Sequence, residues 1–184
     1  MIIGFVLLGI AAVLVVWSIA IYNGLVKLRT MVEEGWSGID VQLKRRANLI
    51  PNLVESVKGY MSHEKNLLTE VTALRTRSLE ATEVGQQSAI EDQLTRAISR
   101  IFAVAENYPD LKASQNFIDL QQRIAEIEDQ IQMARRYYNG TVRNLNIKAD
   151  QFPGNILAAK FNFVKAEFFE IEEPGDRAVP KVSF

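Results

Sequence analysis

The stretch that decides the fold is Ile2–Ile21, IIGFVLLGIAAVLVVWSIAI, an apolar run without a charged side chain. A helix needs about 20 such residues to cross about 30 Å of hydrocarbon. Trp17 and Tyr22 lie near the end of the run, where amphipathic rings favour the membrane interface. The run therefore predicts one transmembrane helix over residues 1–24. Its expected membrane-embedded residues include Ile3, Phe5, Leu8, Val13, Val16, Trp17 and Ile21.

The alternative for this run is a cleaved signal peptide, with Ser18-Ile-Ala20 as a weak cleavage candidate. A signal peptide needs a basic segment before a shorter apolar stretch. Only the chain's own amine precedes this run, which is also long, so we expect an uncleaved anchor. Lys27 and Arg29 follow the run, whereas the other side carries no Lys or Arg. The positive-inside rule then predicts an outside N-terminus and a cytoplasmic helical domain.

Composition excludes several classes of function. The chain carries 21 basic and 22 acidic residues, so it lacks the basic excess that is typical of nucleic-acid binders. It contains no cysteine, which excludes disulfides, thiol catalysis and thiolate metal sites. The single histidine, His63, excludes any site that needs two imidazoles. We expect no catalytic residue, no cofactor and no metal.

Apolar residues recur with a seven-residue spacing in the remainder of the chain. Such a repeat is typical of helices packed at shallow angles. The clearest stripe runs from Phe117 to Leu145, in a helix expected to begin near Ser114. The other stripes are Trp36, Ile39, Leu43, Arg46, Ile50, Leu53, Val57 and Tyr60, resumed by Leu67, Val71 and Leu74; Ile90, Leu94, Ala97, Ile101, Val104 and Tyr108; and a short last one of Ile156, Ala159, Phe163 and Ala166.

Glycine and proline divide these stripes. Gly85, Pro109 and Pro153-Gly154 mark breaks between helices. Pro51 either begins a helix or kinks one that continues from the membrane, and the unbroken heptad phase favours the kinked continuous helix. A break near Gly59–Ser62 is equally compatible with the sequence. The sequence predicts an all-α fold, in which the N-terminal transmembrane helix continues into a long antiparallel four-helix bundle over residues 25–168. An open coiled-coil rod is the alternative, but loops of at most about ten residues favour the closed bundle.

One basic segment is a candidate interaction surface. Asp40–Asn52 concentrates charged and amide side chains within a few helical turns. It could contact anionic lipid headgroups or form a polar network at a subunit contact. The alternative is a solvated helix face with pairs such as Asp40 and Lys44, and three cations fall short of the four to eight of a lipid-binding cluster. The candidate residues are Lys44, Arg45, Arg46 and Asn48.

Three further features stand out, namely Tyr138, the C-terminal tail and His63. Tyr138 lies on the clearest apolar stripe, so we expect its ring to be buried and its hydroxyl to find a partner. The C-terminal tail, residues 169–184, is expected to be extended, and Val182 and Phe184 alternate with polar residues. We expect these two side chains to dock on the bundle or on a neighbouring subunit, because an apolar chain end frays unless it is held. His63 and Glu64 diverge by about 100° on a helix and predict a surface histidine.

Several motifs together resemble the bacterial LemA family. They include Glu34–Ser37 (EGWS), Ile39–Arg46 (IDVQLKRR), Leu49–Val54 (LIPNLV) and Ala134–Asn139 (ARRYYN), with Phe152-Pro153 and the closing Pro180, Val182 and Phe184. The resemblance covers nearly the whole chain; Gly35 and Met61 stand where alanine is common in the family. It implies a membrane-anchored antiparallel helical bundle, and it implies no reaction. We expect the bacterial inner membrane as the location of the chain.

The sequence therefore predicts a non-enzymatic, membrane-anchored scaffold or interaction protein that forms homo-oligomers and contacts protein partners of unknown identity, without binding nucleic acid. One alternative is a regulatory accessory of an envelope-stress, protease or signalling system. Another is an anionic-lipid-binding protein that organises the membrane.

Overall fold

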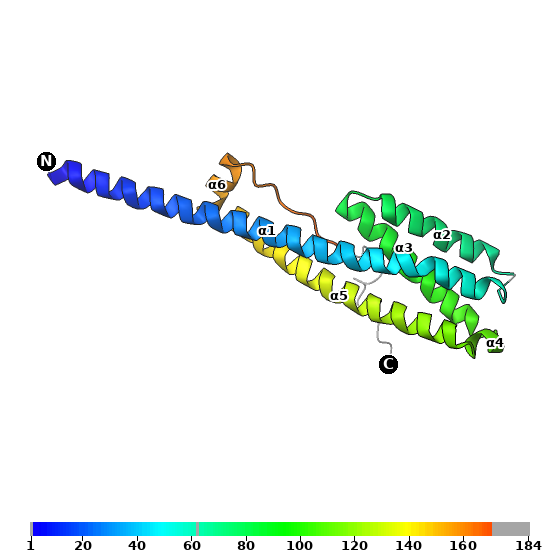
Figure 1. The fold of residues 1–184 in the computed structure, drawn as a ribbon. Coiled ribbons are helices and arrows are strands. Elements are labelled where there is room, and N and C mark those ends of the chain that lie inside the picture. The colour runs from blue at the N-terminus through cyan, green and yellow to red at the C-terminus, as the bar shows by residue number, and fades with distance from the viewer. Residues whose placement is uncertain (1, 62, 171–184) are drawn as a thin grey trace, which may run out of the picture. The chain divides into compact units, whose positions relative to one another are not determined.

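The computed structural model describes residues 2–61 and 63–170, and every regular element in that part of the chain is a helix. The all-helical prediction is thus confirmed at the level of fold class (Figure 1). Contacts divide the described chain into two units, residues 2–40 with 132–168 (unit 1) and residues 41–131 with 169–170 (unit 2). The elements are α1 (Ile2–Lys58), α2 (Lys65–Glu80), α3 (Val84–Ala105), α4 (Pro109–Lys112), α5 (Gln115–Asp150) and α6 (Gly154–Lys160).

Unit 1 combines the apolar N-terminal part of α1 with the second half of α5 and with α6. One stretch of α1 has a mean hydropathy of 2.8 and no buried residue, so it is long and apolar enough to cross a membrane. The first buried side chain of α1 is Ile21, followed by Leu25 one turn later. Packing on α1 therefore begins where the apolar run ends. Further along, α1 and α5 approach closely, since a Cβ on Gly35 would lie 3.2 Å from the Cα of Tyr138.

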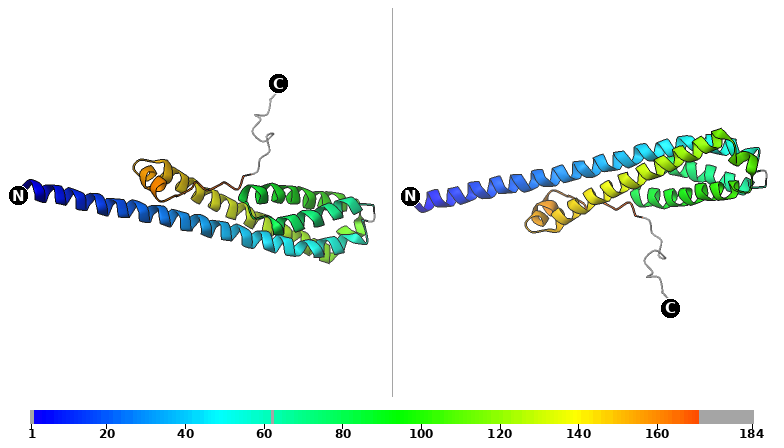
Figure 2. Two further views of the ribbon diagram at one scale, coloured as in Figure 1. Left: turned by 90° about the horizontal axis from the view of Figure 1, so that it is seen from above. Right: turned by 90° about the horizontal axis from the view of Figure 1, so that it is seen from below.

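Unit 2 contains the principal hydrophobic core. The end of α1 lies beside α2, α3 and the start of α5 in both views of Figure 2. The heptad stripes supply the core, because residues three and four apart share one face of a helix. Burial of these side chains removes apolar surface from water, at roughly 25 cal/mol per Å². Fully buried members include Leu53, Val57, Val71, Leu94, Ile101 and Leu111.

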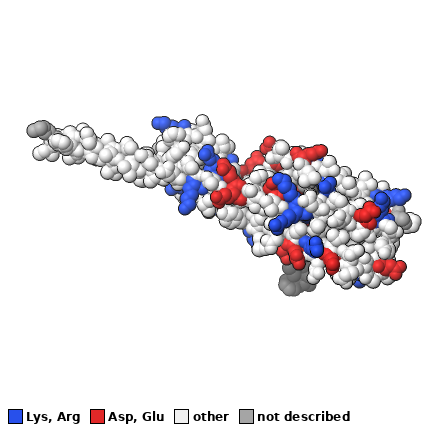
Figure 3. All heavy atoms as spheres, viewed as in Figure 1, with Lys and Arg blue, Asp and Glu red and all other residues white. Residues whose placement is uncertain are grey.

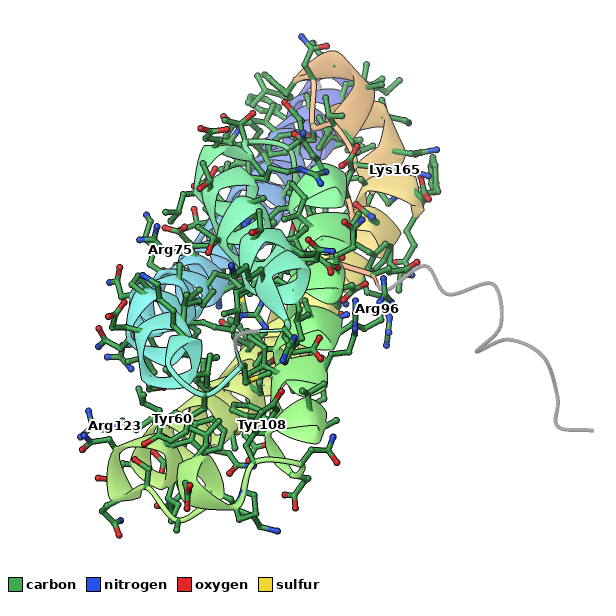
Figure 4. All side chains as sticks on the ribbon, turned by 90° about the vertical axis from the view of Figure 1, so that its right-hand side faces the viewer. Tyr60, Arg75, Arg96, Tyr108, Arg123 and Lys165 are labelled. Atoms are coloured by element: carbon green, nitrogen blue, oxygen red, sulfur yellow. The ribbon has the colours of Figure 1, made fainter. Side chains whose placement is uncertain are left out.

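Pro51 lies inside α1, which continues to Lys58, so the continuous helix is the correct alternative and the chain breaks after Lys58. Proline has no N–H and leaves the carbonyl four residues earlier without its helical donor. That carbonyl belongs to Ala47, and the Nε–H of Arg75 on α2 donates to it at 2.7 Å. Arg75 is labelled in Figure 4. A side chain from the neighbouring helix thus replaces the missing backbone hydrogen bond.

The predicted breaks agree with the helix ends, with two differences. Gly85 is the second residue of α3, and the interruption falls just before it. The last helix was expected to continue through Phe163 and Ala166, but α6 ends at Lys160. Asn162 adopts a left-handed conformation, with φ of 54°, and the N–H of Phe163 donates to the carbonyl of Ala158 at 2.9 Å. These features are typical of a helix C-terminus and turn the chain away from the helix axis.

Candidate functional site

Arg46 lies at the centre of a buried ion network in unit 2. Its side chain, on α1, is 1% exposed. It donates to the carboxylates of Glu91 on α3 and Glu128 on α5. It also donates to the hydroxyl of Thr95 at 2.6 Å and to the backbone carbonyl of Glu91 at 3.4 Å. One guanidinium therefore joins three helices that are far apart in the sequence, because its planar fork carries several donors.

A second layer of polar groups completes the coordination of Glu91. The hydroxyl of Ser78 on α2 donates to the carboxylate oxygen that does not face Arg46. The Nε2–H group of Gln87 donates to the same oxygen at 2.7 Å and to the backbone carbonyl of Ser78 at 3.0 Å. A buried carboxylate needs such donors, because isolated charge is costly in a low-dielectric interior. The network therefore includes side chains from α1, α2, α3 and α5.

The network has the chemistry of a structural site. Its groups satisfy one another, and only the Nε of Arg46 is buried without a partner among the described residues. The described residues contain no group of three His, Cys, Asp or Glu side chains that could hold a metal ion. His63 is exposed in the turn between α1 and α2. Removing one partner from a buried pair is strongly destabilising, so the network favours one packing arrangement of unit 2.

The predicted interaction surface is divided by the fold. Lys44, Arg45 and Asn48 are exposed on α1, and Arg45 contacts Gln42 at 3.5 Å. Arg46 is buried and does not belong to that surface. The position of Arg46 in the heptad stripe could have predicted its burial from the sequence. The other members of that stripe from Ile39 to Val57 are buried as well. Whether the three exposed residues bind lipid or protein stays a prediction.

The predicted docking of the C-terminal tail stays a prediction as well, because Val182 and Phe184 lie outside the described residues.

In unit 1, aromatic rings gather at the end of the apolar run. The ring centroid of Tyr22 lies 4.8 Å from that of Phe161 and 5.8 Å from that of Phe163, both in edge-to-face geometry. The guanidinium of Arg29 lies over the ring of Phe163 at 5.3 Å. Edge-to-face pairs add about 0.5–1.5 kcal/mol beyond area burial, and cation–π contacts about 0.5–1 kcal/mol at exposed sites. The left-handed turn at Asn162 places Phe161 and Phe163 on the same tyrosine ring.

The segment that follows α6 is held against α5 by side chains that bind its backbone. Asn146 donates to the carbonyl of Ala166 and accepts from its N–H, both at 3.0 Å. The hydroxyl of Tyr138 donates to the carbonyl of Glu167 at 2.8 Å, which confirms the expected partner for this buried ring. Burial raises the pKa of Tyr138, and the negative charge of Glu167 raises it further. Asn146 thus supplies both hydrogen-bond partners for the backbone of Ala166, a residue that was expected to lie in the last helix.

Unit 2 also has an open groove of about 710 Å³ between the end of α1 and α2. Its floor is apolar, with Val54, Met61 and Leu68, and Lys58 and Lys65 also line it. The sequence pattern gave no sign of this groove, because both sides are ordinary amphipathic helix faces.

Comparison with known proteins places the chain in a family. The model of the LemA family matches residues 35–184. Magnetosome protein MamQ 2 of Paramagnetospirillum magneticum is 26% identical, with 86% of this chain and 68% of the relative covered. Protein LemA of Metamycoplasma hominis is 28% identical, with 82% of this chain and 69% of the relative covered. The resemblance of the sequence motifs is thereby confirmed, and the chain belongs to the LemA family.

Proposed function

We propose that the chain is a non-enzymatic scaffold, anchored in the membrane by the start of α1, whose helices self-associate and hold partner proteins at the bilayer. The observation that carries the proposal is the continuity of α1 from Ile2 to Lys58. Its first part contains an apolar stretch in which no described residue is buried, and its last part belongs to the hydrophobic core of unit 2. A single helix without a loop thus joins a lipid-compatible segment to a packed helical unit.

Two features support a binding role over catalysis. Four buried polar side chains of unit 2 are engaged with one another in the Arg46 network, namely Arg46, Ser78, Gln87 and Glu91. The exposed surface is made of helix faces, and antiparallel four-helix packing would present long faces of this kind to partners. We further propose that the bundle lies on the cytoplasmic side of a bacterial inner membrane, because Lys27 and Arg29 follow the apolar run.

The anchor is tested with the full chain in bacterial membranes and a charged variant of the apolar run. Leu8→Arg with Val13→Arg places two cations in the middle of the run, at about 2.5–3.5 kcal/mol each on insertion scales. We expect the natural chain to resist alkaline carbonate extraction and the variant to be released. Leu79→Arg, at a half-exposed apolar position on α2, is the matched control and should stay in the membrane. Release of the natural chain would refute the anchor.

Self-association is tested by light scattering of the gently solubilised full chain. We expect a protein mass that is a multiple of 20.8 kDa, or a complex with a copurifying protein. A strict monomer without any partner would overturn the scaffold proposal while leaving the anchor intact.

A further inference from the structure

Large apolar side chains lie exposed around α6, in the part of unit 1 that contacts the end of the apolar run. Four of them define what we call the junction patch. Exposed apolar residues scattered singly are ordinary on a protein surface, but several within one short segment mark a contact with a partner or a membrane. The members of the junction patch are Phe152, Ile156, Phe161 and Val164, exposed by 78%, 57%, 49% and 81%.

The position of the junction patch along α1 is set by ring contacts. Phe161 packs edge-to-face on Tyr22, the residue directly after the Ile2–Ile21 run. That run has the length that about 30 Å of hydrocarbon requires, so Tyr22 falls at the boundary between hydrocarbon and headgroups. Figure 2 shows α6 at the end of α5 that lies beside this part of α1. Phe161, the residue directly after α6, therefore lies at the level of this boundary.

Cations surround the same level of unit 1. Lys27 and Lys160 are exposed, and Arg29 lies over Phe163. Lys165 is also exposed and pairs with Asp150 at 2.8 Å. In Figure 3 the start of α1 shows only uncharged atoms, and the charged atoms that first follow it are blue. Such cations can contact the phosphates of anionic lipid headgroups, while neighbouring apolar side chains enter the acyl boundary.

We propose that the junction patch inserts into the bilayer interface beside the transmembrane helix, so that α6 is a second, monotopic contact of unit 1 with the same leaflet. The inference rests on the proposed anchor and deepens it, because the ligand of this surface is the lipid bilayer. The length of a single transmembrane helix fixes neither its tilt nor its rotation in the bilayer. A second contact with the same leaflet would restrict both for unit 1.

The absence of natural cysteine allows the depth of single positions to be measured in the full chain. Ile156→Cys and Val164→Cys carry an environment-sensitive nitrobenzoxadiazole dye, in vesicles of phosphatidylethanolamine and phosphatidylglycerol. Leu8→Cys, in the apolar run, is the control for anchoring. Leu79→Cys, exposed on unit 2, is the control for a water-facing apolar position. Circular dichroism verifies that each labelled chain keeps its helicity.

We expect the dyes at positions 156 and 164 to emit at a shorter wavelength than the dye at position 79. We also expect lipids that carry a nitroxide near the headgroup to quench at least half of the emission at positions 156 and 164. Dyes that report water at both positions while Leu8 reports lipid would overturn the inference and leave the anchor intact. Shielding from water without quenching by the nitroxide lipid would also overturn it, and would assign the patch to a second copy or a protein partner. A dye at Leu8 that reports water would refute the anchor, and the inference with it.

Discussion

Replacement of Arg46 by methionine is the most direct test of the buried network in unit 2. Methionine keeps the length of the apolar stem and removes the guanidinium. Glu91, whose side chain is 4% exposed, then loses the cationic partner that Arg46 provides in the interior. Loss of one member of such a pair costs about 3–5 kcal/mol. The side chain of Glu128 is 23% exposed and is therefore partly hydrated. Loss of the ion pair between Arg46 and Glu128 adds only about 0–1 kcal/mol to the cost.

The expected decrease in the free energy of unfolding for Arg46→Met is therefore about 3–5 kcal/mol. Urea denaturation of the full chain in detergent micelles, followed by circular dichroism, measures it, with an unchanged slope against denaturant. Arg45→Met is the matched control, because Arg45 is the exposed neighbour on the same helix, and should change stability by no more than about 0.5 kcal/mol.

A double variant separates the charge effect from simple loss of packing. Glu91→Gln in the Arg46→Met background removes the unpaired charge and keeps an acceptor for the hydroxyl of Ser78. The double variant should be more stable than Arg46→Met alone, with a coupling energy of about 0.5–3 kcal/mol. If Arg46→Met were no less stable than Arg45→Met, or if the double variant lost stability additively, the network would not have the role that we assign to it.

Three further predictions concern unit 1. Gly154→Ala should lower the melting temperature and cost about 1–3 kcal/mol, because the added Cβ would lie 2.3 Å from the backbone carbonyl oxygen of Lys148. Gly140→Ala should raise the melting temperature, since nothing lies within 4 Å of the added Cβ and alanine gains about 0.5–1 kcal/mol over glycine inside a helix. The raised pKa of Tyr138 means that its contribution to stability is fully present below pH 10.0, the ordinary value, and is lost as pH rises through the higher folded value. Tyr138→Phe should therefore lose less stability than the natural chain between neutral and strongly alkaline pH, and equal losses in alkaline denaturation would contradict this.

Much of the fold was readable from local pattern. The heptad stripes predicted the long helices, and the phase held across Pro51 as the structure shows. The same pattern placed Arg46 among core residues, yet the neighbouring Lys44 and Arg45 favoured a surface interpretation. Its carboxylate partners lie 45 and 82 residues away, and no local spacing reveals such pairs.

The segment after α6 shows a second limit of pattern. Ile156, Ala159, Phe163 and Ala166 have helical spacing, but helical spacing alone cannot indicate that Asn146 will bind the backbone of Ala166. The contacts of the Tyr22 ring with Phe161 and Phe163 likewise join residues far apart in the sequence, so no local spacing predicts them. The apolar run itself was plain from the sequence, because it needs only composition and length.

The hydrogen bond from Arg75 to the carbonyl of Ala47 has a consequence for how α2 and α1 are aligned. Apolar stripes with a regular period permit two helices to slide past each other by one turn at little loss of contact. Proline leaves one particular carbonyl, that of Ala47, without its helical donor. The side chain of Arg75 reaches this carbonyl in the observed alignment of the two helices. Pro51 thereby selects a single axial alignment of the two helices, a choice that the repeating core residues could not make by themselves.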